Sequence, residues 1–146
     1  MTKYITSFTK GYCDHWTISK AITEYISNFL DSEGEQEYEF TEDSITLTNK
    51  NIIVSNKLIL SGCTDKKFNE DQRGYYGQGS MQAMCVLTAL DINVSIHNGD
   101  VVWDARFENN PQFGMEVLVV DETPYQPSDN FSVHISGLAE EDIDEV

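Results

Sequence analysis

The chain has little cysteine, no long apolar run and few basic residues, and each shortage excludes a class of protein. Its cysteines, Cys13, Cys63 and Cys85, are odd in number and lack the paired spacing of a zinc site or a disulfide framework. We therefore expect free thiols and a cytoplasmic location. No stretch reaches the roughly 18 uncharged apolar residues that span a bilayer, and the first residues contain no apolar run typical of a secretory signal.

Basic residues are the scarcest charged type. Against nine Lys and Arg stand 25 Asp and Glu, which gives a formal net charge of −16. A phosphate backbone attracts positive charge, so we expect no direct binding to nucleic acid. Two interpretations of the acidity stay open. It keeps the protein soluble, or it forms an acidic surface that imitates nucleic acid and occupies a basic protein partner.

The remaining composition is that of one globular domain. Hydrophobic residues make up 40% of the chain, and its 146 residues are enough to bury a core. No Pro/Gly/Ser-rich linker and no internal repeat marks a boundary. We expect one domain over residues 1–137, followed by a solvated acidic tail over 138–146, where five of the nine residues are acidic.

Apolar periodicity predicts two helices. The first runs to Asp31, with Thr17 or Ser19 as its cap, and its apolar residues recur at steps of three and four: Ile18, Ala21, Ile22, Tyr25, Ile26, Phe29 and Leu30. The second helix covers residues 80–90 and places Met81 and Met84 in the core.

Short β-prone runs fill most of the remaining sequence. We expect a strand over 37–40 and a hairpin of 44–48 with 51–54, and we expect residues 55–73 to form a loop. Four more strands are predicted at 93–98, 101–107, 115–121 and 131–136, the first two joined by an Asn-Gly turn. This order predicts an α+β two-layer sandwich, with the helices on one face of a mostly antiparallel sheet.

Polar residues on the first helix could carry chemistry. Glu24, Asn28 and Asp31 follow one another at steps of four and three residues, which places them on one helical face. On its own, this pattern is also the ordinary polar side of a surface helix.

A glycine-rich segment stands before the second helix. In GYYGQG, residues 74–79, Gly74, Gly77 and Gly79 let the backbone approach a ligand, and the helix that follows offers free N–H groups to an anion. Lys66 and Lys67 lie in the preceding loop. A carboxylate, an amide oxygen and a glycine turn are together suited to a nucleotide site.

These two segments resemble motifs of one family. AITEYISNFLD is similar to the Glu-x-x-x-Asn-x-x-Asp helix of the GHKL ATPase superfamily, shared by DNA gyrase, the heat-shock chaperone, histidine kinases and MutL. GYYGQGSMQAM resembles the glycine motif at the end of that superfamily's ATP lid. The resemblance runs from Trp16 to Ile135 and implies the Bergerat ATP-binding fold.

The resemblance also implies roles for individual residues. Glu24 is the expected general base for water, Asn28 the expected ligand of the magnesium ion on ATP, and Asp31 a neighbour of the nucleotide. The phosphates are expected against Gly74, Gly77, Gly79 and the amides of Gln78 and Ser80, with residues 55–73 as the lid and Lys66 or Lys67 near the terminal phosphate.

The sequence departs from the family at two places. Asn49 and Asn51 stand where the adenine-reading Asp-x-Gly-x-Gly motif has an aspartate and a glycine, although the Asn49 amide can still bond to an adenine. Ser132 or His134 stands in place of a late threonine.

Two functions stay open. One is an ATP-binding protein with weak or partner-dependent hydrolysis, possessing no transducer domain and acting through a protein partner or as a homodimer. The other is a non-enzymatic acidic interaction or inhibitor protein. Its small size and acidity are typical of a phage product, whose location is the host cytoplasm.

Overall fold

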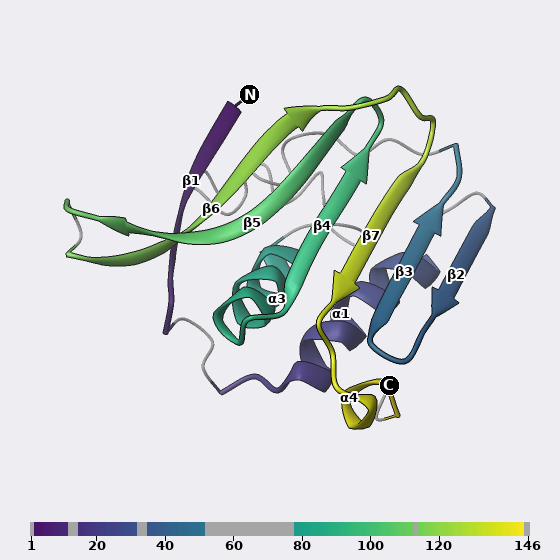
Figure 1. The fold of residues 1–146 in the computed structure, drawn as a ribbon, viewed down its shortest axis with the longest axis horizontal. Coiled ribbons are helices and arrows are strands. Elements are labelled where there is room, and N and C mark those ends of the chain that lie inside the picture. Colours follow the sequence, from purple (N-terminus) through teal and green to yellow (C-terminus); the bar gives the residue numbers. More distant parts are fainter. Residues whose placement is uncertain (1, 12–14, 32–34, 52–77, 113, 145–146) are drawn as a thin grey trace.

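The computed structural model describes residues 2–11, 15–31, 35–51, 78–112 and 114–144. Within these residues the protein is an α+β structure, in which α1 and α3 lie on one face of a seven-stranded antiparallel sheet (Figure 1). The elements follow in the order β1 (Thr2–Thr9), α1 (Ile18–Asp31), β2 (Gln36–Phe40), β3 (Ser44–Asn49), α3 (Gln78–Ala89), β4 (Asn93–Asn98), β5 (Val101–Asn110), β6 (Met115–Pro124), β7 (Phe131–Ser136) and α4 (Glu140–Asp144).

The sheet order is β1-β6-β5-β4-β7-β3-β2, and every pairing between neighbours is antiparallel. Strand β7 is the last of the chain, yet it lies between β3 and β4. It therefore joins the early β2–β3 hairpin to the β4–β5–β6 meander. The predicted α+β class and the four late strands are confirmed.

The core lies between the sheet and the two helices. Alternate residues of the central strands face the helices, because successive side chains of a strand point to opposite faces. Trp103 is 1% exposed, and its indole N–H donates to Glu122 Oε1 at 2.8 Å. Met81 and Met84 are fully buried, as predicted. The strand residues of this cluster include Ile45, Leu47, Val94, Ile96, Leu118, Val120, Val133 and Ile135.

Helix α1 is closed at both ends by side chains. Thr17 Oγ1 accepts a hydrogen bond from the N–H of Lys20 at 3.0 Å, so Thr17 is the N-cap. At the other end, the carbonyl of Phe29 accepts from Gln36 Nε2 at 2.8 Å and from Asn49 Nδ2 at 3.1 Å. These bonds satisfy a terminal carbonyl that has no partner inside the helix, and they attach α1 to β2 and β3.

One sequence expectation about local structure is wrong, and the structure contains two elements that the sequence did not predict. The hairpin of 44–48 with 51–54 is wrong, because β2 and β7 occupy both edges of β3. Strand β1 was not predicted, although its buried Thr6 and Phe8 show the alternation of a strand. The acidic tail begins with a buried Leu138 and forms the short helix α4, whose Ile143 packs against the core.

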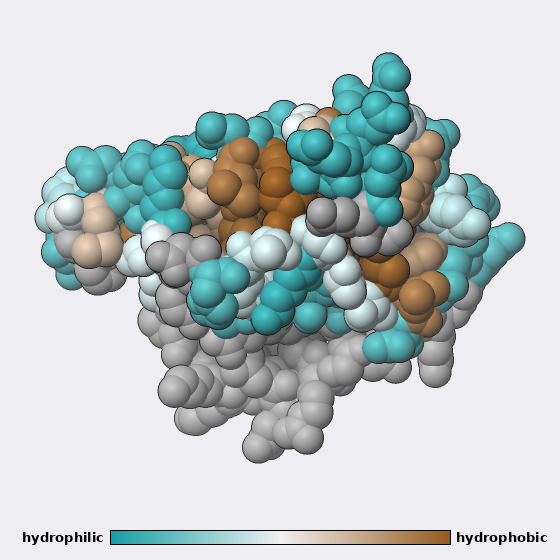
Figure 2. Space-filling model, turned by 90° about the horizontal axis from the view of Figure 1, so that it is seen from below, coloured by the Kyte–Doolittle hydropathy of each residue, from teal (hydrophilic) through white to brown (hydrophobic). Residues whose placement is uncertain are grey.

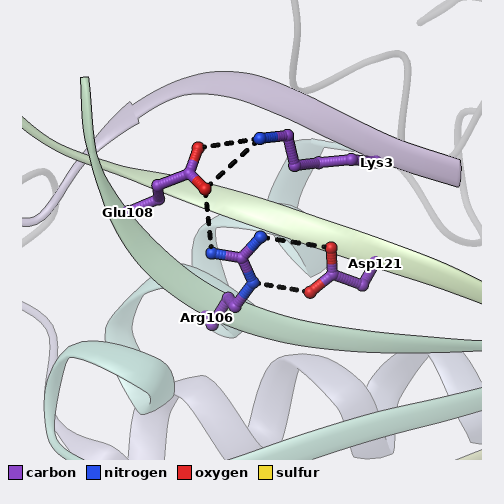
Figure 3. Close-up of polar contacts among 4 residues, drawn as sticks. All are labelled: Lys3, Arg106, Glu108 and Asp121. Carbon is purple, nitrogen blue, oxygen red and sulfur yellow. Dashed lines mark hydrogen bonds and ion pairs between the residues drawn. The ribbon is translucent and has the colours of Figure 1, made fainter. Parts of the chain in front are cut away.

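The sheet face opposite the helices carries an ion network across three strands (Figure 3). Arg106 on β5 donates to Asp121 on β6, with Nε at 2.6 Å from Oδ2, and to Glu108 Oε1 at 3.2 Å. Lys3 on β1 donates to Glu108 at 3.1 Å. The bond from Lys3, and then that from Arg106, lowers the pKa of Glu108, while the bond to Asp121 raises the pKa of Arg106.

The network predicts an acid-dependent loss of stability. A carboxyl group whose pKa is lowered by folding stabilises the protein above its unfolded pKa, and this contribution disappears as the pH falls through the folded value. Glu108→Gln should therefore unfold at lower denaturant concentration than the parent at pH 7, and the difference should be smaller at about pH 3, below the ordinary pKa of a glutamate. Urea titrations at both pH values measure this. Lys3→Met should lower the free energy of unfolding less in the Glu108→Gln background than in the parent, because its partner is already missing there. Equal losses in the two backgrounds would contradict the network.

Candidate functional site

The two predicted motifs meet where α1 packs beside α3. The hydroxyl of Tyr25 on α1 donates to the carbonyl of Ser80 on α3 at 3.0 Å, and both residues are buried. Next to this bond, Glu24 lies against the first turn of α3. A Cβ atom added to Gly79 would lie 2.9 Å from Glu24 Cδ and would overlap the carboxylate. Glycine at position 79 therefore lets the carboxylate approach the backbone closely.

Two polar residues beside this contact are buried. Asn28 lies one turn further along α1 and is 7% exposed. Ser80 is 1% exposed, and its Oγ has no hydrogen-bond partner among the described residues. A buried hydroxyl without a partner is uncommon, and a bound polar group is one of the explanations for it. Its position at the start of α3 therefore makes this junction a candidate binding site.

The electrostatics of the junction favour negative charge. Helix α3 begins at Gln78, so Gly79 and Ser80 lie in its first turn. The N–H groups of a first turn have no acceptors inside the helix, and the helix dipole places partial positive charge there. The Glu24 carboxylate already lies beside this partial positive charge and partly neutralises it. An anion bound beside it would be repelled by Glu24 unless a cation lay between the two.

The other predicted site residues are more widely distributed. Asp31 is the exposed last residue of α1. Asn49 is buried on β3, and its side-chain N–H donates to Phe29, so this donor serves to attach α1. Asn51 has a positive φ of 61°, and its backbone N–H donates to Asn130 Oδ1 at 3.2 Å. Lys66, Lys67, Gly74 and Gly77 lie outside the described residues.

Ser132 and His134 do not approach this junction. They alternate along β7 with Val133 and Ile135, which belong to the core, so their side chains lie on the opposite face of the sheet. There Ser132 Oγ bonds to Thr48 Oγ1 at 2.9 Å, and His134 Nδ1 bonds to Thr46 Oγ1 at 2.7 Å. Neither side chain therefore faces α1 and α3.

Tyr25 is the residue whose role the sequence did not indicate. It falls in the apolar stripe of α1, and periodicity counts it as a core residue, which its complete burial confirms. Its hydroxyl nevertheless fixes the position of α3. A buried tyrosine normally finds a hydrogen-bond partner, and this is the only signal that could have suggested such a contact.

Comparison with known proteins adds no assignment. No protein-family model matches the chain, and no curated protein matches it.

Among the described residues, no group of three or more His, Cys, Asp or Glu side chains converges on a metal position. None of the helices described here is both long and apolar enough to cross a membrane.

The hydrogen bond of Asn49 predicts the effect of placing an aspartate at that position. In Asn49→Asp, a carboxylate oxygen would face the Phe29 carbonyl, so this acceptor would lose one of its two donors and a buried charge would lie beside it. We expect the free energy of unfolding to fall by about 1–3 kcal/mol at pH 7, and by less at pH 4, where a protonated carboxyl group can donate. Urea denaturation at both pH values measures this. An unchanged or increased stability at pH 7 would contradict the assigned bond.

Proposed function

We propose that this chain binds ATP with magnesium at the junction of α1 and α3, and that it hydrolyses ATP weakly or only with a partner. The observation that carries the proposal is the contact between Glu24 and Gly79, which brings together the two segments that resemble ATPase motifs. The element order, with the first motif on α1 and the second opening α3, supports the Bergerat fold as the finer description of this α+β sandwich.

The junction assigns a task to each nearby residue in this proposal. The backbone N–H groups from Gln78 to Ser80 would donate hydrogen bonds to phosphate oxygens, and the Ser80 hydroxyl would gain a hydrogen-bond partner. Asn28 would hold magnesium through its amide oxygen, with phosphate oxygens and water as the other ligands that this ion prefers. Glu24 would orient and deprotonate a water molecule. Magnesium would supply charge neutralisation between phosphate and Glu24.

Residues beyond the junction complete the proposal from the resemblance alone. Asp31 and Asn49 would lie toward the base, while Gly74, Gly77, Lys66 and Lys67 would close over the phosphates. In this proposal the protein acts in the cytoplasm, and ATP binding there changes its interaction with a protein partner.

Gly79→Ala tests the contact on which the proposal depends. ATP with magnesium at 100 times its dissociation constant should stabilise the parent by about 2.7 kcal/mol. The added Cβ displaces Glu24, and a tenfold weaker affinity would reduce this gain to about 1.4 kcal/mol. Without ligand, the variant should stay within about 1 kcal/mol of the parent, because alanine favours the helix while the Glu24 side chain has to move. Thermal melts with and without ATP and magnesium measure both effects.

The matched control for this substitution is Gly11→Ala. A Cβ at Gly11 would meet no atom within 4 Å, so this variant should keep the full response to ATP. If ATP with magnesium leaves the melting temperature of the parent unchanged, the proposed function is wrong. If Gly79→Ala and Gly11→Ala respond alike, the ligand does not bind at the junction.

Glu24→Gln separates binding from hydrolysis. Removing the negative charge beside the phosphates should tighten ATP binding in the absence of magnesium, and it should lower any turnover by about 10²–10⁴-fold. Isothermal titration with EDTA and a phosphate-release assay with magnesium measure the two effects. Glu116→Gln changes the same charge at an exposed position on β6 and should alter neither. Unchanged turnover in Glu24→Gln would exclude Glu24 as the base.

A further inference from the structure

The outer edge of the sheet is formed by β2, a short strand whose five residues are all exposed. Among the described residues it pairs with β3 on one side and is the last strand in the sheet order. An edge strand presents backbone N–H and C=O groups that can pair with another chain. The residues of β2 take no part in the contact between Glu24 and Gly79, so the properties of this edge do not depend on the proposed nucleotide.

The ladder between β2 and β3 fixes which backbone groups face outward. The N–H of Lys50 donates to the carbonyl of Glu35 at 2.7 Å, and the N–H of Thr41 donates to the carbonyl of Ser44 at 2.9 Å. In an antiparallel pair, hydrogen-bonded positions alternate with positions whose groups point away. Tyr38 and Phe40 are residues of the second kind, so their backbone N–H and C=O groups point away from β3.

The same residues supply exposed aromatic side chains. Tyr38 is 72% exposed and Phe40 is 42% exposed, and their rings meet edge to face with centroids 6.0 Å apart. Leu30, near the end of α1, is 62% exposed, and its carbonyl accepts from Gln36 Nε2 at 3.3 Å. Tyr38 and Phe40 share the sheet face of Leu47 and Ile45, their partners on β3. The side of the molecule that carries β2 lies at the right of Figure 2, where apolar and hydrophilic surface adjoin.

The charge around this edge is of one sign. Residues 35–51 contain five acids and a single base, Lys50, which forms an ion pair with Glu37. That pair is exposed, and it raises the pKa of Lys50. Glu37 and Glu39 alternate with the aromatic residues and point to the other face of the strand. The edge therefore offers backbone groups with an apolar side and an acidic side.

From these observations we infer that the free edge of β2 binds an extended, basic segment of a partner protein as an additional antiparallel strand. Lysine or arginine side chains of the segment would lie beside Glu37 and Glu39, and its alternate apolar side chains would contact Tyr38 and Phe40. Backbone hydrogen bonds supply affinity in this mode of recognition, and alternate side chains supply specificity.

A second copy of this chain is a poor occupant of the same edge. In a symmetric antiparallel pair centred on Tyr38, Glu37 of each copy would face Glu39 of the other. Like charges directly opposite each other are destabilising. Acidic residues on an edge strand are also a common protection against unwanted pairing. Here they exclude another acidic strand and attract a basic one, so the same two side chains select the partner.

Three heptapeptides labelled with a fluorophore test the proposal against the full chain. One alternates lysine and valine, one alternates glutamate and valine, and one is the lysine peptide with N-methylated valines, which cannot donate backbone hydrogen bonds. Fluorescence anisotropy at about 50 mM salt should show binding of the first peptide only, and about 500 mM salt should weaken it strongly. Equal binding of the lysine peptide and its N-methylated form would indicate plain charge attraction and overturn the proposal.

Variants of the chain locate the binding. Glu37→Gln with Glu39→Gln should weaken the lysine peptide about tenfold, because two facing charges are lost. Glu140→Gln with Glu141→Gln removes the same net charge from α4 and should change the affinity less than about twofold. Tyr38→Pro removes one outward N–H, which an edge strand tolerates, and should weaken binding by about tenfold or more. Equal effects of the two double variants would overturn the assignment to β2.

Two further results decide the remaining possibilities. If Tyr38→Pro does not fold, as judged by circular dichroism, the N-methylated peptide and the Glu37/Glu39 variant still test the edge. Sedimentation of the unliganded chain should show no association through this edge. A dimer that Glu37→Gln with Glu39→Gln strengthens and Tyr38→Pro abolishes would show that a second copy occupies the edge, and would overturn the proposal.

Discussion

The packing of α1 against α3 is the contact on which the candidate site depends. Among the described residues, a buried hydrogen bond from Tyr25 to the Ser80 carbonyl joins the two helices, and the absence of a side chain at Gly79 lets them come close. The bond sets the position of α3 along α1, and the glycine lets a carboxylate reach the first turn of α3. Since the two helices share one face of the sheet, neither could shift without disturbing the core between them.

A second attachment determines where the site faces. The end of α1 is tied to the β2–β3 hairpin through the Phe29 carbonyl, which receives donors from Gln36 and Asn49. Strand β7 in turn joins this hairpin to the rest of the sheet. A movement of the hairpin would therefore displace the end of α1, the helix that carries Glu24 and Asn28. The same hairpin bears the exposed edge, so a strand bound there would be connected to the junction through α1.

The sequence predicted those features that arise from local patterns. The stripe on α1, the Thr17 cap and the Asn-Gly turn before β5 each follow from residues close together in the chain, and the structure contains all three. Features that depend on distant pairing were not predictable in this way. Strand β3 pairs with β7, which lies far along the chain. No local signal in the sequence distinguishes that pairing from a hairpin with residues 51–54.

The residues of the candidate site show the same difference between local sequence patterns and contacts of distant segments. Glu24 and Gly79 were singled out from motifs, and the fold brings them into contact. Ser132 and His134 stand near the place where the family that the sequence resembles has a threonine, but the two-residue period of β7 turns their side chains away from the helices. Asn49 was singled out from the resemblance as a residue near an adenine, and in the structure its side-chain amide donates to a carbonyl in the last turn of α1. An amide can do this and a carboxylate cannot, since only the amide has an N–H to give to a carbonyl. Asparagine at position 49 thus has a structural reason in this chain, whichever ligand the junction binds.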